Sequence, residues 1–223
     1  MMVKIPSVLN ESQLKRIHSI LEKASFVDGK LSAGMAAKRV KNNEEMDVRA
    51  AEIEALNDIV MNSLVSHPVY KAAAMPLRVA APYYARYQIG KYYGDHVDDP
   101  IMFAGSPYRS DISTTVFLTD PADYEGGELV VRTTFGDAEV KLPAGHAVVY
   151  PSASIHHVNE VTNGERIVAV SWAQSMVRDP ARREILFDLY NAREKMLVDM
   201  VGKEETDQVD RSYVNLVRMW SEL

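Results

Sequence analysis

The chain contains no cysteine among its 223 residues. This absence excludes disulfide bonds, thiolate metal ligands and a cysteine nucleophile, so histidines and carboxylates are the remaining candidates for binding a metal ion. Long apolar runs are also missing, and the first ten residues lack the apolar stretch of a signal peptide. We therefore expect a cytoplasmic protein that makes no use of a membrane.

Positive charge is in the minority as well. The sequence has 25 Lys and Arg against 31 Asp and Glu, a formal net charge of −6. Because this balance offers a phosphate backbone little attraction, nucleic acid is not an expected partner. Apolar residues make up 47% and charged residues 25% of the chain, which is typical of a globular protein. The length allows one large β-rich domain with helical additions.

Helical periodicity marks two stretches near the N-terminus. In residues 11–24 apolar residues recur at spacings of three and four, and Asn10 is a suitable N-cap. A second predicted helix runs from about Asn43 to Ser66, with an acidic opening at residues 44–47.

Helical spacing returns after Asp179-Pro180, in two pieces that Gly202-Lys203 separates. The second piece carries Tyr213, Leu216 and Trp220 on one stripe. Such stripes most often pack within their own chain, and a homodimer through this stripe is the alternative.

Short β-prone runs separated by turn residues fill the middle of the chain, from about Pro76 to Met176. Gly126-Gly127 and Asn163-Gly164 are among the turns, and we expect their glycines to have a structural role. Strands at such short spacing predict a sandwich or a barrel.

Histidines in this β region suggest a metal site. His96 and Asp98 in GDHVDDP can reach one ion together, since residues i and i+2 of a strand project from the same face. His156 and His157 are adjacent in PSASIHHV and point to opposite faces of a regular strand, so at most one joins the pair. The flanking alternation does not decide which. Two histidines and one carboxylate are the ligands of non-haem Fe(II) oxygenases.

A His-x-Asp pair often arises by chance, so the prediction depends on the whole set. Arg166 lies ten residues after His156, past the Asn163-Gly164 turn, and opens the strand RIVAVSWAQ. From there its guanidinium could meet a carboxylate deeper in the barrel, as a dicarboxylic co-substrate would require.

Three stretches together resemble the bacterial PKHD-type hydroxylases, a prolyl-4-hydroxylase-like branch of the Fe(II)/2-oxoglutarate dioxygenases. They are YARYQIGKYYGDHVDDP, DISTTVFLTDPADYEGGELVV and LPAGHAVVYPSASIHHVNEVTNGERIVAVSWAQSMVRD. The N-terminal FVDGKLSAGMAAKRVKNN resembles the same family, with Phe26 where tryptophan is expected. The resemblance covers nearly the whole chain.

The resemblance implies a mainly β fold with flanking helices, built on a double-stranded β-helix or jelly-roll core. Its expected divisions are an N-terminal helical support segment at 1–75, the Fe(II)/2-oxoglutarate dioxygenase core at 76–177 and a C-terminal helical extension at 178–223.

The site residues also follow from the resemblance. It implies that His96, Asp98 and His156 bind the metal, that His157 does not, and that Arg166 pairs with the distal carboxylate of 2-oxoglutarate.

Two tyrosines have weaker assignments. Tyr87 matches an aromatic position that lines the co-substrate pocket, whereas Tyr93 could line the metal side of the pocket or simply pack as an aromatic residue.

The implied activity is hydroxylation of an unidentified small-molecule or peptidyl substrate, coupled to oxidative decarboxylation of 2-oxoglutarate. Fe(2+), dioxygen and L-ascorbate are the implied requirements, and the family's association with iron uptake suggests a siderophore-related or stress-related substrate. The residues that select it are expected on loops such as residues 99–108. Two alternatives are a non-catalytic cupin-like protein that binds a metal or small molecule, and a structural or interaction protein whose histidines serve polar packing.

Overall fold

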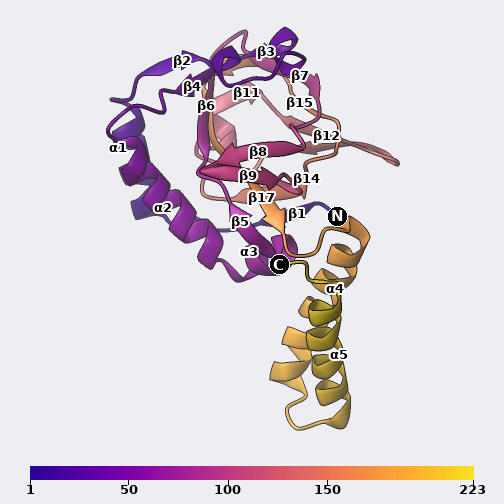
Figure 1. Cartoon of the computed structure of the whole chain (residues 1–223). Helices are drawn as coiled ribbons and strands as arrows, with labels where there is room; N and C mark the ends of the chain where they lie inside the picture. Colours follow the sequence, from indigo (N-terminus) through magenta and orange to yellow (C-terminus); the bar gives the residue numbers. More distant parts are fainter.

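The computed structural model describes residues 1–223. A β-rich body carries the catalytic candidates, and a long helical hairpin projects from one end of it (Figure 1). Every strand pairing in the body is antiparallel.

The larger sheet has eight strands, of which seven follow the order β1-β14-β10-β17-β6-β4-β2 while β5 pairs with β17. Their bounds are β1 Val3–Ile5, β2 Phe26–Asp28, β4 Glu44–Met46, β5 Pro76–Val79, β6 Tyr83–Tyr87, β10 Ile112–Phe117, β14 Ala147–Pro151 and β17 Arg166–Ser175.

A smaller sheet has the order β13-β12-β15-β7-β3, and two strand pairs, β8 with β9 and β11 with β16, lie outside both sheets. The bounds are β3 Lys41–Asn42, β7 Tyr92–His96, β12 Leu129–Thr133, β13 Gly136–Val140, β15 His156–Val158, β8 Ile101–Ala104, β9 Ser106–Arg109, β11 Tyr124–Gly126 and β16 Val161–Gly164. Short 3-10 helices are η1 Gly29–Leu31, η2 Ala37–Arg39 and η3 Pro121–Asp123.

The two sheets face each other and enclose an apolar interior. Buried side chains of both sheets meet there, including Phe117 and Val168 from the larger sheet and Leu129 and Val158 from the smaller one. Facing antiparallel sheets of this kind form a jelly-roll, so the expected fold class is confirmed.

N-terminal helices cover the outer face of the larger sheet. They are α1 (Glu11–Leu21), α2 (Ile53–Ser66) and α3 (Pro68–Ala74). Asn10 caps α1 as predicted, in a reciprocal pair of hydrogen bonds with Gln13. Ile17 and Leu56 pack in the same core cluster as Val116 of β10. The helices thereby bury the sheet face opposite to the interior.

The predicted helix from Asn43 to Ser66 is wrong in its first ten residues, because α2 begins only at Ile53, while residues 41–42 form β3 and residues 44–46 form β4. The acidic residues that suggested a helix start have other partners. Glu44 accepts a hydrogen bond from Arg86, and Glu45 accepts one from Lys41. Buried and partly buried residues alternate along residues 41–45, as they do along a strand. All five residues are polar, so the sequence does not show this alternation.

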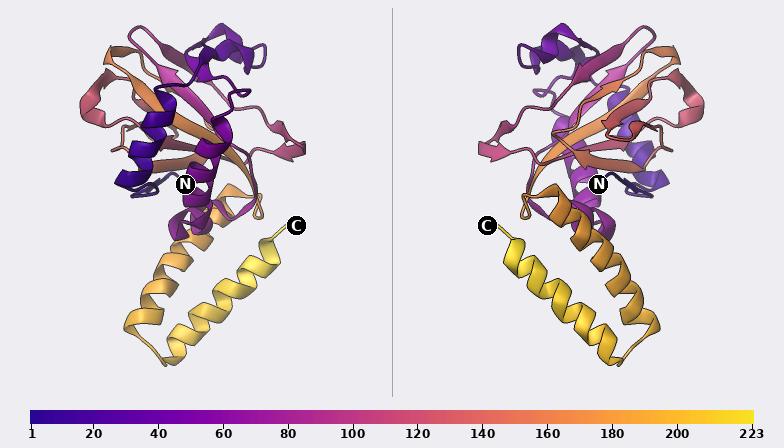
Figure 2. Two further views of the ribbon diagram at one scale, coloured as in Figure 1. Left: turned by 90° about the vertical axis from the view of Figure 1, so that its left-hand side faces the viewer. Right: turned by 90° about the vertical axis from the view of Figure 1, so that its right-hand side faces the viewer.

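The C-terminal extension consists of α4 (Pro180–Asp199) and α5 (Glu204–Trp220), with Asp179 capping α4. Figure 2 shows both helices projecting away from the β-rich body. The stripe of Tyr213, Leu216 and Trp220 packs at the base of the hairpin against a small buried cluster of Met75, Val177 and Leu186. None of the helices combines the length and the apolar character needed to cross a membrane.

Candidate active site

His96, Asp98 and His156 come together at one end of the smaller sheet. His96 ends β7 and pairs directly across the strands with His156 of β15. Asp98 Oδ1 lies 3.9 Å from His96 Nε2, and Asp98 Oδ2 lies 3.8 Å from His156 Nε2. All three ligand atoms lie within 4.8 Å of one another. One metal ion can therefore sit between them, with the rest of its coordination sphere open.

Both imidazoles are held by their second nitrogen. His96 Nδ1 lies 2.8 Å from the carbonyl oxygen of Gly94, and His156 Nδ1 lies 3.0 Å from that of Ser154. Donation from Nδ1 to these carbonyls leaves Nε2 free as a ligand, the usual arrangement at metal sites. Burial, with a contribution from nearby His156, lowers the pKa of His96 to about 4, so this ring is neutral near pH 7.

The carboxylate is oriented from the opposite sheet. Ser113, on the inward face of β10, donates its hydroxyl to Asp98 Oδ2. Ser113 Oγ also lies 2.8 Å from Ser152 Oγ, whose hydroxyl can donate to it in turn. Both serines are buried. The Asp98 side chain is thus fixed in the direction of the two histidines.

His157 lies outside this cluster. Its ring contacts Asp95 Oδ1 through Nδ1 at 2.9 Å and Asn159 Oδ1 through Nε2 at 3.1 Å. Because β15 is extended, His157 points to the face of the smaller sheet opposite to His156.

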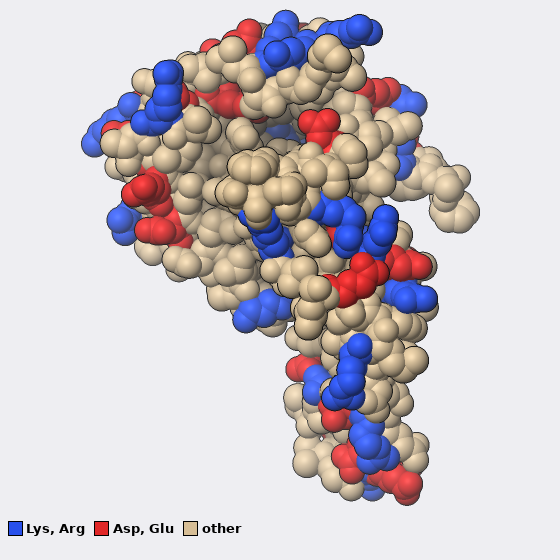
Figure 3. All heavy atoms as spheres, viewed as in Figure 1, with Lys and Arg blue, Asp and Glu red and all other residues tan.

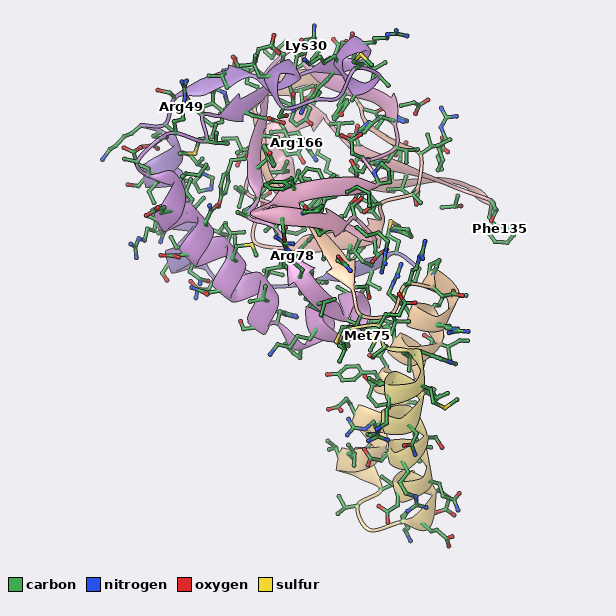
Figure 4. All side chains as sticks on the ribbon, in the orientation of Figure 1. Lys30, Arg49, Met75, Arg78, Phe135 and Arg166 are labelled. Atoms are coloured by element: carbon green, nitrogen blue, oxygen red, sulfur yellow. The ribbon has the colours of Figure 1, made fainter.

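A cavity of about 580 Å³ connects the three ligand residues with Arg166. Figure 3 shows a hollow on the viewed face, bordered mainly by residues other than Lys, Arg, Asp and Glu. Figure 4 shows Arg166 inside the β-rich body. Arg166 is only 1% exposed, and its Nε and Nη1 have no hydrogen-bond partner. The guanidinium carbon lies 4.9 Å from the Tyr87 ring centroid and 5.6 Å from that of Phe117. A buried cation without an ion-pair partner calls for an anion.

Gly127 makes the position of Arg166 sterically accessible. It has a φ of +65°, and a Cβ at this position would lie 3.0 Å from Arg166 Cδ and 3.1 Å from Tyr124 Cε2. The glycine that the turn pattern marked as structural therefore also clears space beside the arginine.

Comparison with known proteins agrees with this geometry. The 2OG-Fe(II) oxygenase superfamily model matches residues 82–174. A PKHD-type hydroxylase of Thioalkalivibrio sulfidiphilus is 50% identical over 224 residues, and the PKHD-type hydroxylase YbiX of Escherichia coli is 42% identical over 225 residues. In both comparisons the match covers 100% of each chain. The chain belongs to the PKHD-type hydroxylases.

Membership of this family makes the chain an oxidoreductase, a 2-oxoglutarate-dependent dioxygenase whose superfamily uses Fe(2+). The fold agrees with it. A prolyl hydroxylase from Trichoplax adhaerens, solved with a hypoxia inducible factor peptide fragment, superposes with a TM-score of 0.56 at 16% identity. The match covers 82% of this chain and 86% of that one.

The chemistry of the site suits the cofactors of the family. Two imidazoles and one carboxylate are suitable ligands for Fe(2+), and the unpaired guanidinium of Arg166 suits one carboxylate of a diacid. The triad and Arg166 line the same cavity, so one bound molecule can contact both.

The two predicted tyrosines also line this cavity. Tyr87 is 3% exposed, and burial raises its pKa to about 12 although nearby Arg166 opposes the rise. Tyr93 stacks on His96, with 3.6 Å between ring centroids and 11° between planes. It therefore packs against a candidate ligand and lines the cavity at the same time.

Several polar residues of the site were not predicted from the sequence, among them Ser113, Ser152 and Asn43. In hindsight the strand ISTTVF carries a weak signal, because three of its six residues are hydroxyl residues in a fully buried strand. Buried hydroxyl groups need partners, and here Ser113 finds one in Asp98.

Proposed function

We propose that this protein hydroxylates an as yet unidentified substrate, with Fe(2+) bound by His96, Asp98 and His156 and 2-oxoglutarate anchored by Arg166. The reaction consumes substrate, dioxygen and 2-oxoglutarate, and it yields hydroxylated substrate, succinate and carbon dioxide. When bound, Fe(2+) supplies the redox chemistry that activates dioxygen.

The protein's own residues supply orientation and shielding. Arg166 offers two N–H groups to the distal carboxylate, and the phenol of Tyr87 can donate a further hydrogen bond at the same end. The backbone carbonyls of Gly94 and Ser154 keep Nε2 of each imidazole directed at the metal. Ser113 keeps Asp98 from rotating away.

One observation carries the proposal: the buried guanidinium of Arg166 lacks an ion-pair partner and lines the same cavity as the metal triad. A site built only to hold a metal would gain nothing from an unpaired buried cation, which destabilises the folded state. A diacid with one end on the metal and its other carboxylate on Arg166 would explain why the cavity contains both the triad and an unpaired cation.

The substrate would approach through the mouth of the cavity. Several exposed apolar residues border it, namely Val48, Val97, Ile101 and Phe103. Ile101 and Phe103 belong to the residues 99–108 that we expect to select the substrate. A small-molecule substrate linked to iron uptake, a cytoplasmic location and a requirement for L-ascorbate are further parts of the proposal, supported by the family resemblance.

The test is to measure succinate formed by the purified protein with Fe(2+), dioxygen, 2-oxoglutarate and L-ascorbate, alone and against a panel of metabolites and prolyl peptides. We expect basal succinate formation and a rise with the true substrate. Metal and 2-oxoglutarate binding without succinate formation under any condition would instead favour a cupin-like binding protein.

A further inference from the structure

The segment of residues 41–46 closes the cavity between the two sheets. β3 pairs with β7 of the smaller sheet, with Lys41 opposite Tyr93, and β4 pairs with β6 of the larger sheet, with Glu45 opposite Ala85. The segment lies outside residues 82–174, which the oxygenase superfamily model matches. One wall of the active-site cavity therefore comes from the N-terminal part of the chain.

The inward face of this segment is polar. Lys41, Asn43 and Glu45 are buried and line the cavity, whereas Asn42 and Glu44 are only partly buried. Lys41 Nζ donates to Glu45 Oε1, so this pair satisfies its own charges. Asn43 differs from the other two inward side chains, because its Oδ1 is buried without a hydrogen-bond partner.

Asn43 is 2% exposed, and the oxygen of its amide has no hydrogen-bond partner. Asn43 Oδ1 lies against Gly29, where a Cβ would approach it to 2.0 Å. The backbone N–H of Gly29 donates to the carbonyl oxygen of Asn43 at 3.0 Å, which keeps the two residues in place. With the oxygen end enclosed, Nδ2 is the end that can serve a ligand.

Asn43 belongs to the Arg166 end of the cavity. Burial raises the pKa of the Tyr87 phenol to about 12, and Arg166 and the side chain of Asn43 both oppose that rise. The sheet order gives a geometric reason, because β6 lies between β17 and β4, with Tyr87 opposite Arg166 and Arg86 opposite Glu44, the residue after Asn43. Asn43 and Arg166 therefore lie on either side of Tyr87. The three side chains line one cavity, and they form a set of hydrogen-bond donors for one ligand group.

We propose that Asn43 donates its side-chain N–H to the distal carboxylate of 2-oxoglutarate, beside Arg166 and Tyr87. This inference rests on the proposed function. A carboxylate accepts about four hydrogen bonds, of which Arg166 can supply two and Tyr87 one, so that Asn43 supplies the remaining one. The co-substrate pocket is then completed by a segment outside the oxygenase core.

The first test is calorimetric binding of 2-oxoglutarate to Ni(2+)-loaded protein, in which no turnover occurs. Asn43→Ala should weaken binding about tenfold, the effect of one hydrogen bond to a charged group. Asn42→Ala is the matched control, because Asn42 pairs outside the cavity with Gly90 O at 3.1 Å and should leave the affinity within about twofold. Asn43→Asp keeps the shape and should weaken binding about a hundredfold by placing two anions together.

The second test is binding of 2-oxopentanoate, which keeps the metal-chelating end but lacks the distal carboxylate. Wild type and Asn43→Ala should bind it equally. Equal binding of 2-oxoglutarate by wild type and both Asn43 variants, or an equal loss for both ligands, would overturn the role of Asn43. A wild-type protein that binds Ni(2+) but no 2-oxoglutarate would overturn the proposed function, and this inference with it.

Discussion

The two ends of the active-site cavity differ in how complete they are. At the metal end each imidazole has a carbonyl partner and Asp98 has Ser113. At the other end Arg166 Nε and Nη1 are buried without partners. The geometry around the proposed metal site is thus preformed, while on our proposal the far end gains its missing partner only when an anion binds.

The two ends would therefore contribute to ligand binding in different ways. Ligands at the metal end are held in place before the metal arrives, which favours tight and specific coordination. At the far end the buried charge of Arg166 is unfavourable until a carboxylate pairs with it. A diacid should therefore bind more tightly than a ligand without the second carboxylate, which would leave Arg166 unpaired.

Loss of a metal ligand should have the largest effect. His156→Ala removes one of the three ligand atoms that lie within 4.8 Å of each other, and we expect succinate formation to fall to background. His157→Ala is the matched control, since that ring contacts Asp95 and Asn159 outside the cluster. Bound metal measured by mass spectrometry should follow the same pattern. Equal activity of the two variants would show that the preformed end is not the metal site.

Arg166→Leu should affect the two ends differently. We expect 2-oxoglutarate binding to weaken by a few kcal/mol, about a hundredfold or more, because a charge-assisted pair is lost. The same change should raise the melting temperature of the ligand-free protein, since it removes a buried and unpaired cation. Calorimetry and thermal unfolding measure the two effects. A fall in both quantities would mean that Arg166 stabilises the fold and that the two ends do not differ as described.

Ser113→Ala should have a smaller effect, confined to the metal end. Asp98 would keep its place but lose the hydroxyl that orients Oδ2. Loss of such an orienting partner typically weakens metal binding about tenfold or somewhat more. Competition with a chromophoric chelator measures this change, and 2-oxoglutarate affinity at saturating metal should stay constant. Unchanged metal affinity would show that Asp98 is oriented by its backbone alone.

Residues at both ends of the cavity could be predicted from the sequence, for a local reason. His96 and Asp98 are two residues apart, so strand periodicity singled out this pair. Arg166 follows His156 by ten residues, and the choice of His156 over His157 came from the family resemblance. The structure brings these residues into one cavity. Their roles as ligands and anchor stay predictions until the variants above are measured.

Ser113 and Asn43 could not be predicted in the same way. Ser113 meets Asp98 only because β10 lies in the sheet opposite β7. Asn43 lies in a stretch whose acidic residues imitate the start of a helix, and its inward direction depends on pairing with β7 and β6. Contacts of this kind are set by tertiary pairing, which overrides local propensity.

The smallest expected effect is a pH dependence at the metal end of the metal-free protein. Burial lowers the pKa of His96 to about 4 in the folded state, against about 6.5 in an unfolded chain. Below about pH 6.5 the unfolded state therefore binds more protons than the folded state. The contribution of His96 to the free energy of unfolding is then lost as the pH falls from about 6.5 towards 4. Between about pH 7.5 and 5.5 we expect a loss of about 1 kcal/mol from this residue.

Urea unfolding at a series of pH values, on wild type and His96→Gln, isolates that contribution. Glutamine does not titrate, so the variant should lose about 1 kcal/mol less than wild type over the same interval. Added Zn(2+) should steepen the loss for wild type, because protons and metal compete for the same Nε2. Identical pH profiles for the two proteins would mean that His96 is hydrated in the metal-free state, and the metal end would then be less preformed than its hydrogen bonds indicate.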